Sequence, residues 1–156
     1  MALADIRNFE PIGERFGTGG QPTEAQLGDV AADGYTAVVN LGLLDPGYCL
    51  PDEAASVAAL RLAYRHIPVK LDAPTIDDLR SFAATMDEWN GKKMFVHCAA
   101  NYRASVFVAL YGELHLGWTR EHADALTRRV WQPNDTWRAF IARCREEARR
   151  DRVGVW

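Results

Sequence analysis

The segment from His97 to Ser105 holds the residues whose types and spacing point most directly to chemistry. It reads His-Cys-Ala-Ala-Asn-Tyr-Arg-Ala-Ser, after a short apolar run that predicts a strand and before a longer one that predicts a helix. A loop between a strand and a helix N-terminus can turn successive backbone N–H groups inward, where the helix dipole adds partial positive charge. Arg103 can grip two anionic oxygens at once through its guanidinium. The segment therefore predicts an anion-binding cradle.

Cys98 stands at the start of this cradle. A thiolate is itself an anion, so the field that binds oxyanions would also stabilise the thiolate of Cys98. The other cysteines are Cys49 and Cys144, and this odd, widely spaced set of three fits neither a disulfide framework nor a zinc pattern. We therefore expect Cys98 to be a nucleophile, and the alternative is a buried structural cysteine. For Arg103 the alternative is an arginine at a helix start, paired with a nearby carboxylate.

Alternating strands and helices are expected to position the cradle. Thr23 begins a capping box, and Gly34 can adopt the left-handed conformation that ends a helix. From Ile76 to Trp89 the apolar residues recur at helical spacing. The expected elements in chain order are helix 23–34, strand 35–41, helix 51–60, strand 64–69, helix 75–89, strand 93–97, and helices 104–116, 119–130 and 134–149.

This order of elements predicts an α/β fold with a mostly parallel central sheet and helices on both faces. Ligands of such sheets bind beyond the carboxyl ends of the strands, which is where the cradle leaves strand 93–97. The chain of 156 residues shows no internal repeat and no linker, so a single domain over residues 1–156 is expected.

Composition places the chain among ordinary globular proteins. It is 48% hydrophobic and 25% charged, with a net charge of -3. This balance predicts binding neither to nucleic acid nor to an anionic membrane. The stretch from Met1 to Glu10 does not have the pattern of a signal peptide, and no apolar stretch has the length of a membrane span, so a cytoplasmic location is expected.

Arginines gather in the C-terminal part of the chain. From Thr119 onward there are nine arginines against six acidic residues. An acidic partner is one interpretation of this pattern, and a solvated helix face is the one that we favour.

The cradle segment resembles the signature of protein tyrosine and dual-specificity phosphatases, in which His-Cys is followed by five residues, Arg, and then Ser or Thr. More closely, residues 17–141 are similar to small bacterial tyrosine-phosphatase-like proteins, which implies the fold of that family. The motifs that carry the similarity are Gly20-Gln21-Pro22, Gly34-Tyr35, Val39-Asn40-Leu41, Ile67-Pro68-Val69, Asp72-Ala73-Pro74-Thr75 and Trp131-Gln132-Pro133-Asn134.

The position of the arginine departs from the signature, because four residues separate Cys98 from Arg103 where the signature has five. In one interpretation the loop is one residue shorter. In the other, the loop keeps its length, Arg103 stands one place earlier and Ala104 occupies the usual position, since Ser105 keeps the family's spacing. The mid-loop glycine is also absent, and Asn101 is expected to supply the left-handed bend in its place.

The resemblance implies a cysteine-dependent phosphomonoesterase that needs no metal or other cofactor. Its substrate would be a phosphorylated small molecule or a phosphoprotein. Cys98 would attack phosphorus to form a phosphocysteine, while Arg103 and backbone amides hold the phosphate oxygens. The phosphate-binding residues so predicted are Ala99, Ala100, Asn101, Tyr102, Arg103 and Ser105.

Three further residues have expected roles in such a reaction. A carboxylic acid would protonate the leaving oxygen, and Asp72 fits because it follows the strand 64–69, with Asp45 as its rival. His97 is expected to orient the loop rather than to act as a base. Ser105 would assist departure of the thiolate when the intermediate is hydrolysed.

Two other functions are compatible with these residues. Rhodanese-like sulfurtransferases carry a shorter active-site loop than phosphatases, and Cys98 through Arg103 spans six residues. A catalytically inactive binder of phosphate or of a phosphoprotein would keep the cradle and Arg103 without turnover. Sulfur transfer from thiosulfate to cyanide would indicate a sulfurtransferase. Phosphate binding without ester hydrolysis would indicate an inactive binder.

Overall fold

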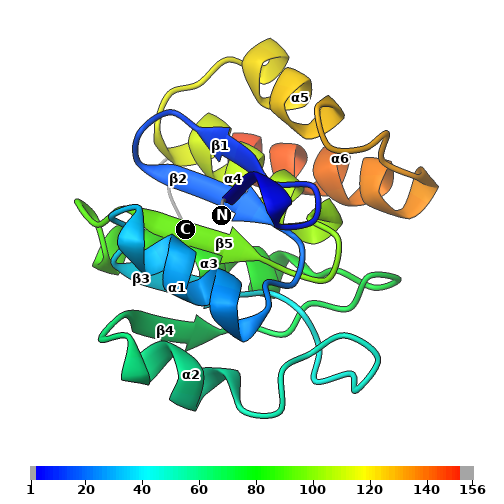
Figure 1. Cartoon of the computed structure of the whole chain (residues 1–156). Coiled ribbons are helices and arrows are strands. Elements are labelled where there is room, and N and C mark those ends of the chain that lie inside the picture. The colour runs from blue at the N-terminus through cyan, green and yellow to red at the C-terminus, as the bar shows by residue number, and fades with distance from the viewer. Residues whose placement is uncertain (1–2, 152–156) are drawn as a thin grey trace.

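A five-stranded sheet forms the centre of the structure, a computed structural model that describes residues 3–151 (Figure 1). The strands are β1 (Glu10–Ile12), β2 (Phe16–Gly19), β3 (Ala37–Asn40), β4 (Ala63–His66) and β5 (Met94–His97). They lie in the order β1-β2-β5-β3-β4, and every neighbouring pair is parallel except β1 and β2. The mostly parallel sheet predicted from the sequence is confirmed.

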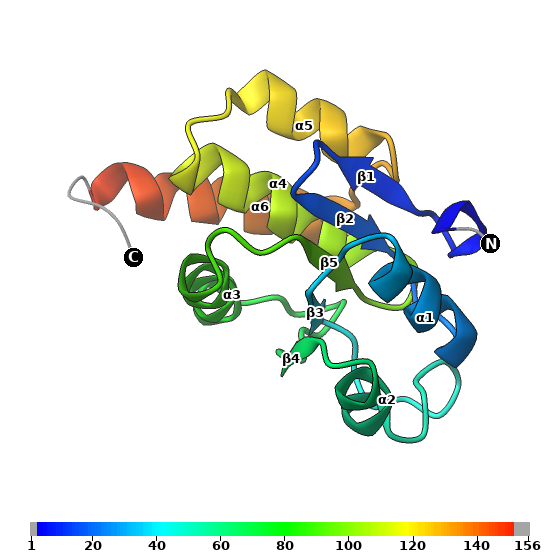
Figure 2. The same cartoon turned by 60° about the vertical axis from the view of Figure 1, so that its left-hand side comes forward.

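Helices cover both faces of this sheet, as predicted. They are the 3-10 helix η1 (Leu3–Asp5) and the α-helices α1 (Glu24–Ala32), α2 (Glu53–Ala59), α3 (Ile76–Glu88), α4 (Tyr102–His115), α5 (Arg120–Arg128) and α6 (Asp135–Arg150). Helices α1 and α2 lie on one face, α3, α4 and α6 lie on the other, and α5 packs beside α4 (Figure 2). Among residues 3–151 no helix is both long enough and apolar enough to cross a membrane.

The strands send alternate side chains to the two faces, so two apolar cores form. Val38 of β3 and Phe95 of β5 pack towards α1 and α2. Val39 and Val96, which follow them in sequence, pack towards α3, α4 and α6. Because both faces of β5 are buried, the position of its carboxyl end, where the cradle begins, is fixed by packing.

The helix starts predicted at Thr23 and Thr75 are confirmed. Each threonine hydroxyl accepts the backbone N–H three residues on, and the side chain of that residue accepts the N–H of the threonine in return. Gly34 follows α1 with a φ angle of 97°, the left-handed conformation expected of it, and Gly91 follows α3 in the same way with a φ angle of 96°.

Three features differ from the expectation. Strands β1 and β2 lie where the sequence predicts no element, because β2 reads Phe-Gly-Thr-Gly and lacks the apolar side chains that signal a strand. Close packing requires its glycines, since a Cβ on Gly17 would lie 2.3 Å from the Tyr35 hydroxyl oxygen. Strand β4 ends at His66, ahead of Pro68, which cannot donate to a neighbouring strand. Helix α4 begins at Tyr102, two residues before its predicted start.

Candidate active site

The cradle joins β5 to α4 at the carboxyl edge of the sheet. Strand β5 ends at His97 and α4 begins at Tyr102, so the loop runs from Cys98 to Asn101. Asn101 is fully buried and has a φ of 72°, which confirms the left-handed bend predicted for it. Arg103 is therefore the second residue of α4 rather than a loop residue.

In the cradle, the backbone N–H groups of Ala99 and of residues 102–104 donate to no acceptor within residues 3–151, and an isolated antiparallel bridge pairs Ala100 with Gly20. The groups on either side are paired, because the Cys98 N–H donates to the Gly19 carbonyl at 3.3 Å and the Ser105 N–H to the Asn101 carbonyl at 3.0 Å. Arg103 and Ala104 are buried, and a buried backbone N–H almost always has an acceptor. The set of unpaired donors therefore has the character of an anion-binding site.

Hydrogen bonds hold the carbonyl oxygens of the loop on the side away from these donors. Asn8 Nδ2 donates to the Ala100 carbonyl at 2.9 Å, and Asn101 Nδ2 donates to the Asn8 carbonyl at 2.7 Å. Asn101 Nδ2 also donates to Thr18 Oγ1 of β2 at 2.9 Å. Because the two polar groups of a planar trans peptide point in opposite directions, engaging the Ala100 carbonyl here turns the next N–H to the other side.

Gly20 lets a neighbouring segment lie directly against the cradle. The Gln21 N–H donates to the Ala99 carbonyl at 3.0 Å, and a Cβ on Gly20 would lie 2.5 Å from that same oxygen. We expect Gly20→Ala to displace the loop and weaken the binding of inorganic phosphate about tenfold, since each misplaced donor loses a hydrogen bond to a charged group. Titration calorimetry tests this. Gly28→Ala is the control, because a Cβ there meets nothing within 4 Å, and equal affinity in both variants would contradict the prediction.

Cys98 and Arg103 are both enclosed by the protein, with exposed fractions of 0% and 4%. Arg103 Nη1 donates to the Val69 carbonyl at 2.8 Å, whereas Arg103 Nε is buried without a hydrogen-bond partner in the described part of the chain. The alternative role for Arg103, an arginine at a helix start, required a carboxylate partner. Among residues 3–151 no carboxylate pairs with Arg103. Its guanidinium therefore keeps a donor and an uncompensated charge for an anion.

The segment after β4 is tied to the cradle side of the molecule at two points. Arg103 holds the Val69 carbonyl, and Trp137 Nε1 of α6 donates to the Leu71 carbonyl at 2.7 Å. Asp72 is the next residue along this segment. Its backbone position is therefore set by contacts with α4 and α6 rather than by the sheet alone.

The two candidate acids differ in what they contact. Asp72 is exposed, and its carboxylate makes no hydrogen bond or ion pair with another residue of the described range 3–151. Asp45 accepts the Gly47 N–H at 2.8 Å within its own turn. Of the two carboxylates, Asp72 is the one without another structural role.

A buried ion pair adjoins the start of the cradle. His97 Nε2 lies 2.5 Å from Glu53 Oε2, and the two side chains are 0% and 5% exposed. The other ring nitrogen, Nδ1, lies 3.2 Å from the Cys98 carbonyl oxygen. Both neighbours are acceptors, so each is placed to accept a hydrogen bond from the ring nitrogen that faces it. The contact with the Cys98 carbonyl is the one that an orienting residue would make.

Glu53 is held in its ionised form by its neighbours. Burial alone would raise the pKa of the Glu53 carboxyl. The hydrogen bond and charge of His97, together with the hydrogen bond that Gln21 Nε2 donates to Glu53 Oε1 at 2.8 Å, outweigh burial and hold this pKa below its ordinary value. Glu53 is therefore a carboxylate at neutral pH, and its hydrogen bond fixes the orientation of the His97 imidazole.

Ser105 and Tyr102 lie in the first turn of α4. Ser105 Oγ donates to the Tyr102 carbonyl at 3.1 Å, so its single proton is not directed at the Cys98 sulfur. The Tyr102 ring stacks on Trp131 with centroids 4.5 Å apart and planes inclined by 8°. Trp131 lies in the segment 129–134 between α5 and α6, so this segment borders the cradle.

Sequence reasoning missed two residues of this arrangement, Glu53 and Trp137, and it marked Gln21 only as part of a motif. Glu53 stands four residues before Val57 in α2, so the two share a helix face, and Val57 is fully buried. A carboxylate on the buried face of a short helix signals a paired charge, because Glu is almost never fully buried alone. Trp137 lies on an apolar stripe, and nothing in that pattern indicates its bond to Leu71.

The sheet order, the cradle and the Cys98–Arg103 pair define an α/β protein of the dual-specificity-phosphatase-like class. The family described as a DSP-PTPase phosphatase fused to NAD+ kinase matches residues 5–149. The chain belongs to this family.

Solved structures and curated proteins agree with this assignment. A DUF442 protein of Shewanella putrefaciens CN-32 is 31% identical, covers 93% of this chain and 95% of its own, and superposes with a TM-score of 0.84. Tk-PTP in its active form is 20% identical over 89% of this chain and 97% of its own, with a TM-score of 0.77, which shows the fold alone. The beta-lactamase hydrolase-like protein of Xylella fastidiosa is 30% identical over 118 residues, which are 74% of this chain and 27% of that protein. The chain therefore spans about a quarter of the length of the curated relatives it matches.

Proposed function

We propose that this chain is a cysteine-dependent phosphomonoesterase that acts through a phosphocysteine intermediate. The observation that carries the proposal is the set of unpaired backbone N–H groups at residues 99 and 102–104, which starts beside Cys98 and includes Arg103. A transferring phosphoryl group spreads its charge over three oxygens, and fixed donors stabilise that charge without reorganising. Membership of a phosphatase family supports the same reaction.

The proposed reaction is a pair of displacements at phosphorus. In the first, the Cys98 thiolate attacks, an S–P bond forms, the ester P–O bond breaks, and the leaving oxygen takes a proton from Asp72. In the second, water attacks the phosphocysteine and gives a proton to Asp72, and the S–P bond breaks to return the thiolate and release inorganic phosphate. The loop amides and Arg103 hold the other three oxygens throughout.

The substrate is a phosphorylated small molecule or a phosphoprotein, and the place of action is the cytoplasm. The mechanism needs a reduced Cys98, and all three cysteines are free thiols. Asp72 is preferred over Asp45 as the acid because its carboxylate has no other partner in the described range, and Asp45 is engaged in a turn.

A second candidate is sulfur transfer, and the shortness of the loop favours it. Only residues 99–101 separate Cys98 from the start of α4. In this reaction the Cys98 thiolate attacks the outer sulfur of thiosulfate, the S–S bond breaks, and sulfite leaves. Cyanide then removes the sulfur from the Cys98 persulfide as thiocyanate and returns the thiolate. Arg103 and the loop amides would hold the oxygens of thiosulfate.

Hydrolysis of para-nitrophenyl phosphate across about pH 5 to 8 tests the proposal. We expect turnover by the wild type, background rates for Cys98→Ser, and a loss of about 10²-fold for Asp72→Asn, because a general acid contributes about 10²- to 10⁴-fold. Asp45→Asn is the control and should stay within about twofold. Thiocyanate formation without ester hydrolysis would replace the phosphatase proposal with sulfur transfer. Phosphate binding without either reaction would leave only a binder.

The Trp137 contact gives a separate prediction about Asp72. Trp137→Phe keeps an aromatic ring in the core but removes the donor to the Leu71 carbonyl, which loosens the segment that carries the acid. We expect kcat for the aryl phosphate to fall about three- to tenfold with KM little changed, since misplacing a catalytic group lowers the rate of the chemical step. Trp89→Phe is the control, because Trp89 caps the far end of α3 and lies neither in the cradle nor in the segment that carries Asp72. Equal kcat values in steady-state assays of the two variants would contradict the prediction.

A further inference from the structure

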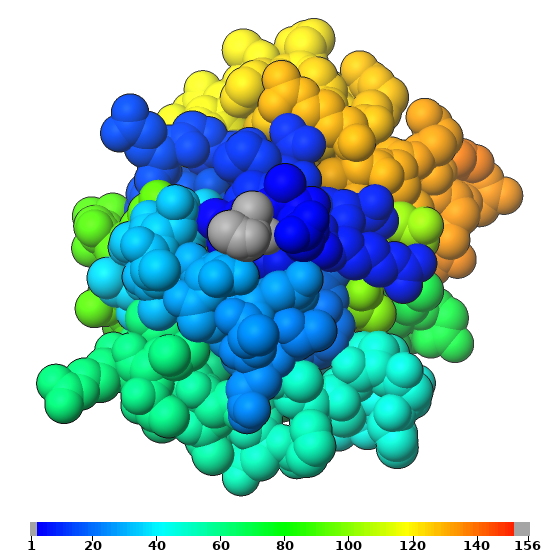
Figure 3. Space-filling view, in the orientation of Figure 1, coloured from blue at the N-terminus to red at the C-terminus, as the bar shows by residue number. Residues whose placement is uncertain are grey.

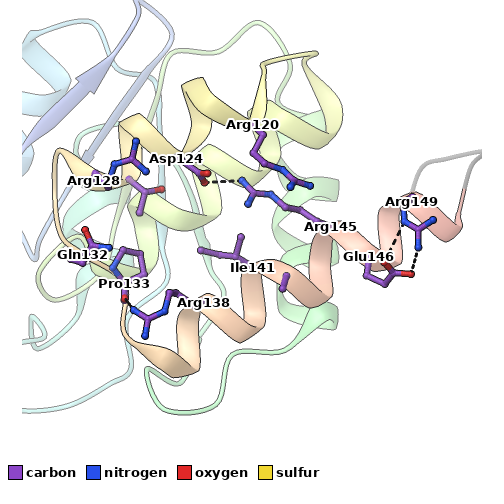
Figure 4. Close-up of a pocket in the computed structure, with 12 residues that line it drawn as sticks. Arg120, Asp124, Arg128, Gln132, Pro133, Arg138, Ile141, Arg145, Glu146 and Arg149 are labelled. Carbon is purple, nitrogen blue, oxygen red and sulfur yellow. Dashed lines mark hydrogen bonds and ion pairs between the residues drawn. The ribbon is translucent and has the colours of Figure 1, made fainter.

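A groove of about 440 Å³ opens between α5 and α6 (Figure 4). These helices, in yellow and orange, form the upper right part of the surface in Figure 3. The volume of the groove falls in the range of about 300 to 1,000 Å³ that is usual for ligand sites. Of the twelve residues that line it, five are arginines and two are acidic. None of them belongs to the cradle.

Ion pairs within the protein already engage three of the five arginines. Arg145 donates to both Glu113 and Asp124, at 2.7 and 2.8 Å. The other two pairs are Arg138 with Asp135, and Arg149 with Glu146 at 2.6 Å. The charges of these three arginines are therefore largely compensated.

Arg120 and Arg128 remain without a hydrogen-bond or ion-pair partner within residues 3–151, and both line the groove. They are eight residues apart on α5, which corresponds to about 12 Å along a helix axis. Figure 4 shows Arg120 towards the end of the groove where Arg145 lies, and Arg128 towards the end formed by Gln132 and Pro133. The groove thus carries one uncompensated positive charge near each end.

We propose that this groove binds an acidic peptide segment of a partner protein in an extended conformation. In an extended chain, side chains four residues apart project from the same face and are about 13 Å apart, which matches the separation of Arg120 and Arg128. Ile141, Ala142 and Pro133 supply apolar surface between the charged ends. A single small anion can satisfy only one of the two arginines, which is why a peptide fits better. The inference does not rest on the proposed phosphatase function.

The test uses the full chain and a fluorescein-labelled peptide with two glutamates four residues apart, followed by fluorescence anisotropy. Arg120→Ala combined with Arg128→Ala should raise Kd at least about tenfold and flatten its dependence on salt, since two charge-assisted contacts are lost. Lys92→Ala combined with Arg143→Ala is the matched control. It removes two exposed positive charges outside the groove and should leave Kd within about twofold.

Three outcomes would overturn the proposal. Equal losses in the two double variants would show attraction by net charge alone. Equal affinity for a peptide whose two glutamates are adjacent would remove the argument from spacing. The third outcome concerns binding of inorganic triphosphate. If the Arg120→Ala, Arg128→Ala double variant loses affinity for triphosphate but keeps its affinity for the peptide, the groove is a small-anion site instead.

Discussion

Replacement of Arg103 by lysine is expected to lower kcat/KM for an aryl phosphate about 10²- to 10³-fold while the protein stays folded. Lysine keeps a positive charge and can donate to the Val69 carbonyl, as Arg103 Nη1 does. It lacks the planar fork that binds two oxygens at once, and it has no counterpart of Arg103 Nε, the buried donor without a partner among residues 3–151. The loss should therefore fall on the transition state, where the charge on the phosphoryl oxygens has to be held.

Steady-state kinetics and a thermal melt of the same preparations separate this effect from misfolding. Arg143→Lys is the matched control, because Arg143 is exposed on α6 and lines neither the cradle nor the groove, and it should change kcat/KM less than about twofold. If Arg103→Lys keeps a third or more of the wild-type kcat/KM, then Arg103 serves to hold the Val69 carbonyl and does not bind the phosphoryl group. That result would leave the loop amides as the only anion-binding groups in the proposal.

Arg103 has two distinct tasks in the proposed mechanism, and they connect the cradle with the proposed acid. Its Nη1 fixes the Val69 carbonyl, and Trp137 fixes the Leu71 carbonyl two residues later. Asp72 follows directly, so the segment that carries the proposed acid is anchored by the same side chain that is proposed to bind the phosphoryl oxygens. Displacing Arg103 should therefore disturb both oxygen binding and the position of the acid, whereas Trp137→Phe should disturb the second alone.

Features determined by a few neighbouring residues could be predicted from the sequence. The capping box at Thr23 depends on side chains three residues apart, and α1 begins where that box indicates. The left-handed bend at Asn101 follows from the ability of asparagine to adopt a positive φ where the family has glycine. The parallel sheet follows from the alternation of apolar strands with amphipathic helices.

Features that depend on distant residues could not be predicted in the same way. The partner of His97 lies 44 residues away on α2, and helical spacing by itself does not show which residue a buried carboxylate contacts. Strand β2 is stabilised by parallel pairing with β5 and by close packing at glycines, so it has no apolar pattern of its own. The start of α4 was also predicted two residues late. The prediction followed the apolar run that begins at Ala104, whereas the helix begins directly after the bend at Asn101.

Glu53→Gln is expected to lower the free energy of unfolding by about 3 kcal/mol near neutral pH, because it removes the charged member of a buried, hydrogen-bonded pair. The amide can still accept a hydrogen bond from His97 Nε2, so the variant tests charge rather than shape. Glu88→Gln is the control. Glu88 pairs with Arg65 at 3.2 Å on the surface, where such pairs contribute at most about 1 kcal/mol.

The pH dependence of the same variant shows whether the carboxylate of Glu53 is responsible. Because the folded-state pKa of Glu53 is held below its ordinary value, its contribution is fully present above the unfolded pKa of about 4.3 and is lost as the pH falls through the lower folded value. The difference in unfolding free energy between wild type and Glu53→Gln should therefore be complete at about pH 5 and shrink on further acidification. Urea titrations at several pH values measure it. A difference that stays constant as the pH falls to about 2 would mean that Glu53 stabilises the fold by packing rather than by its charge.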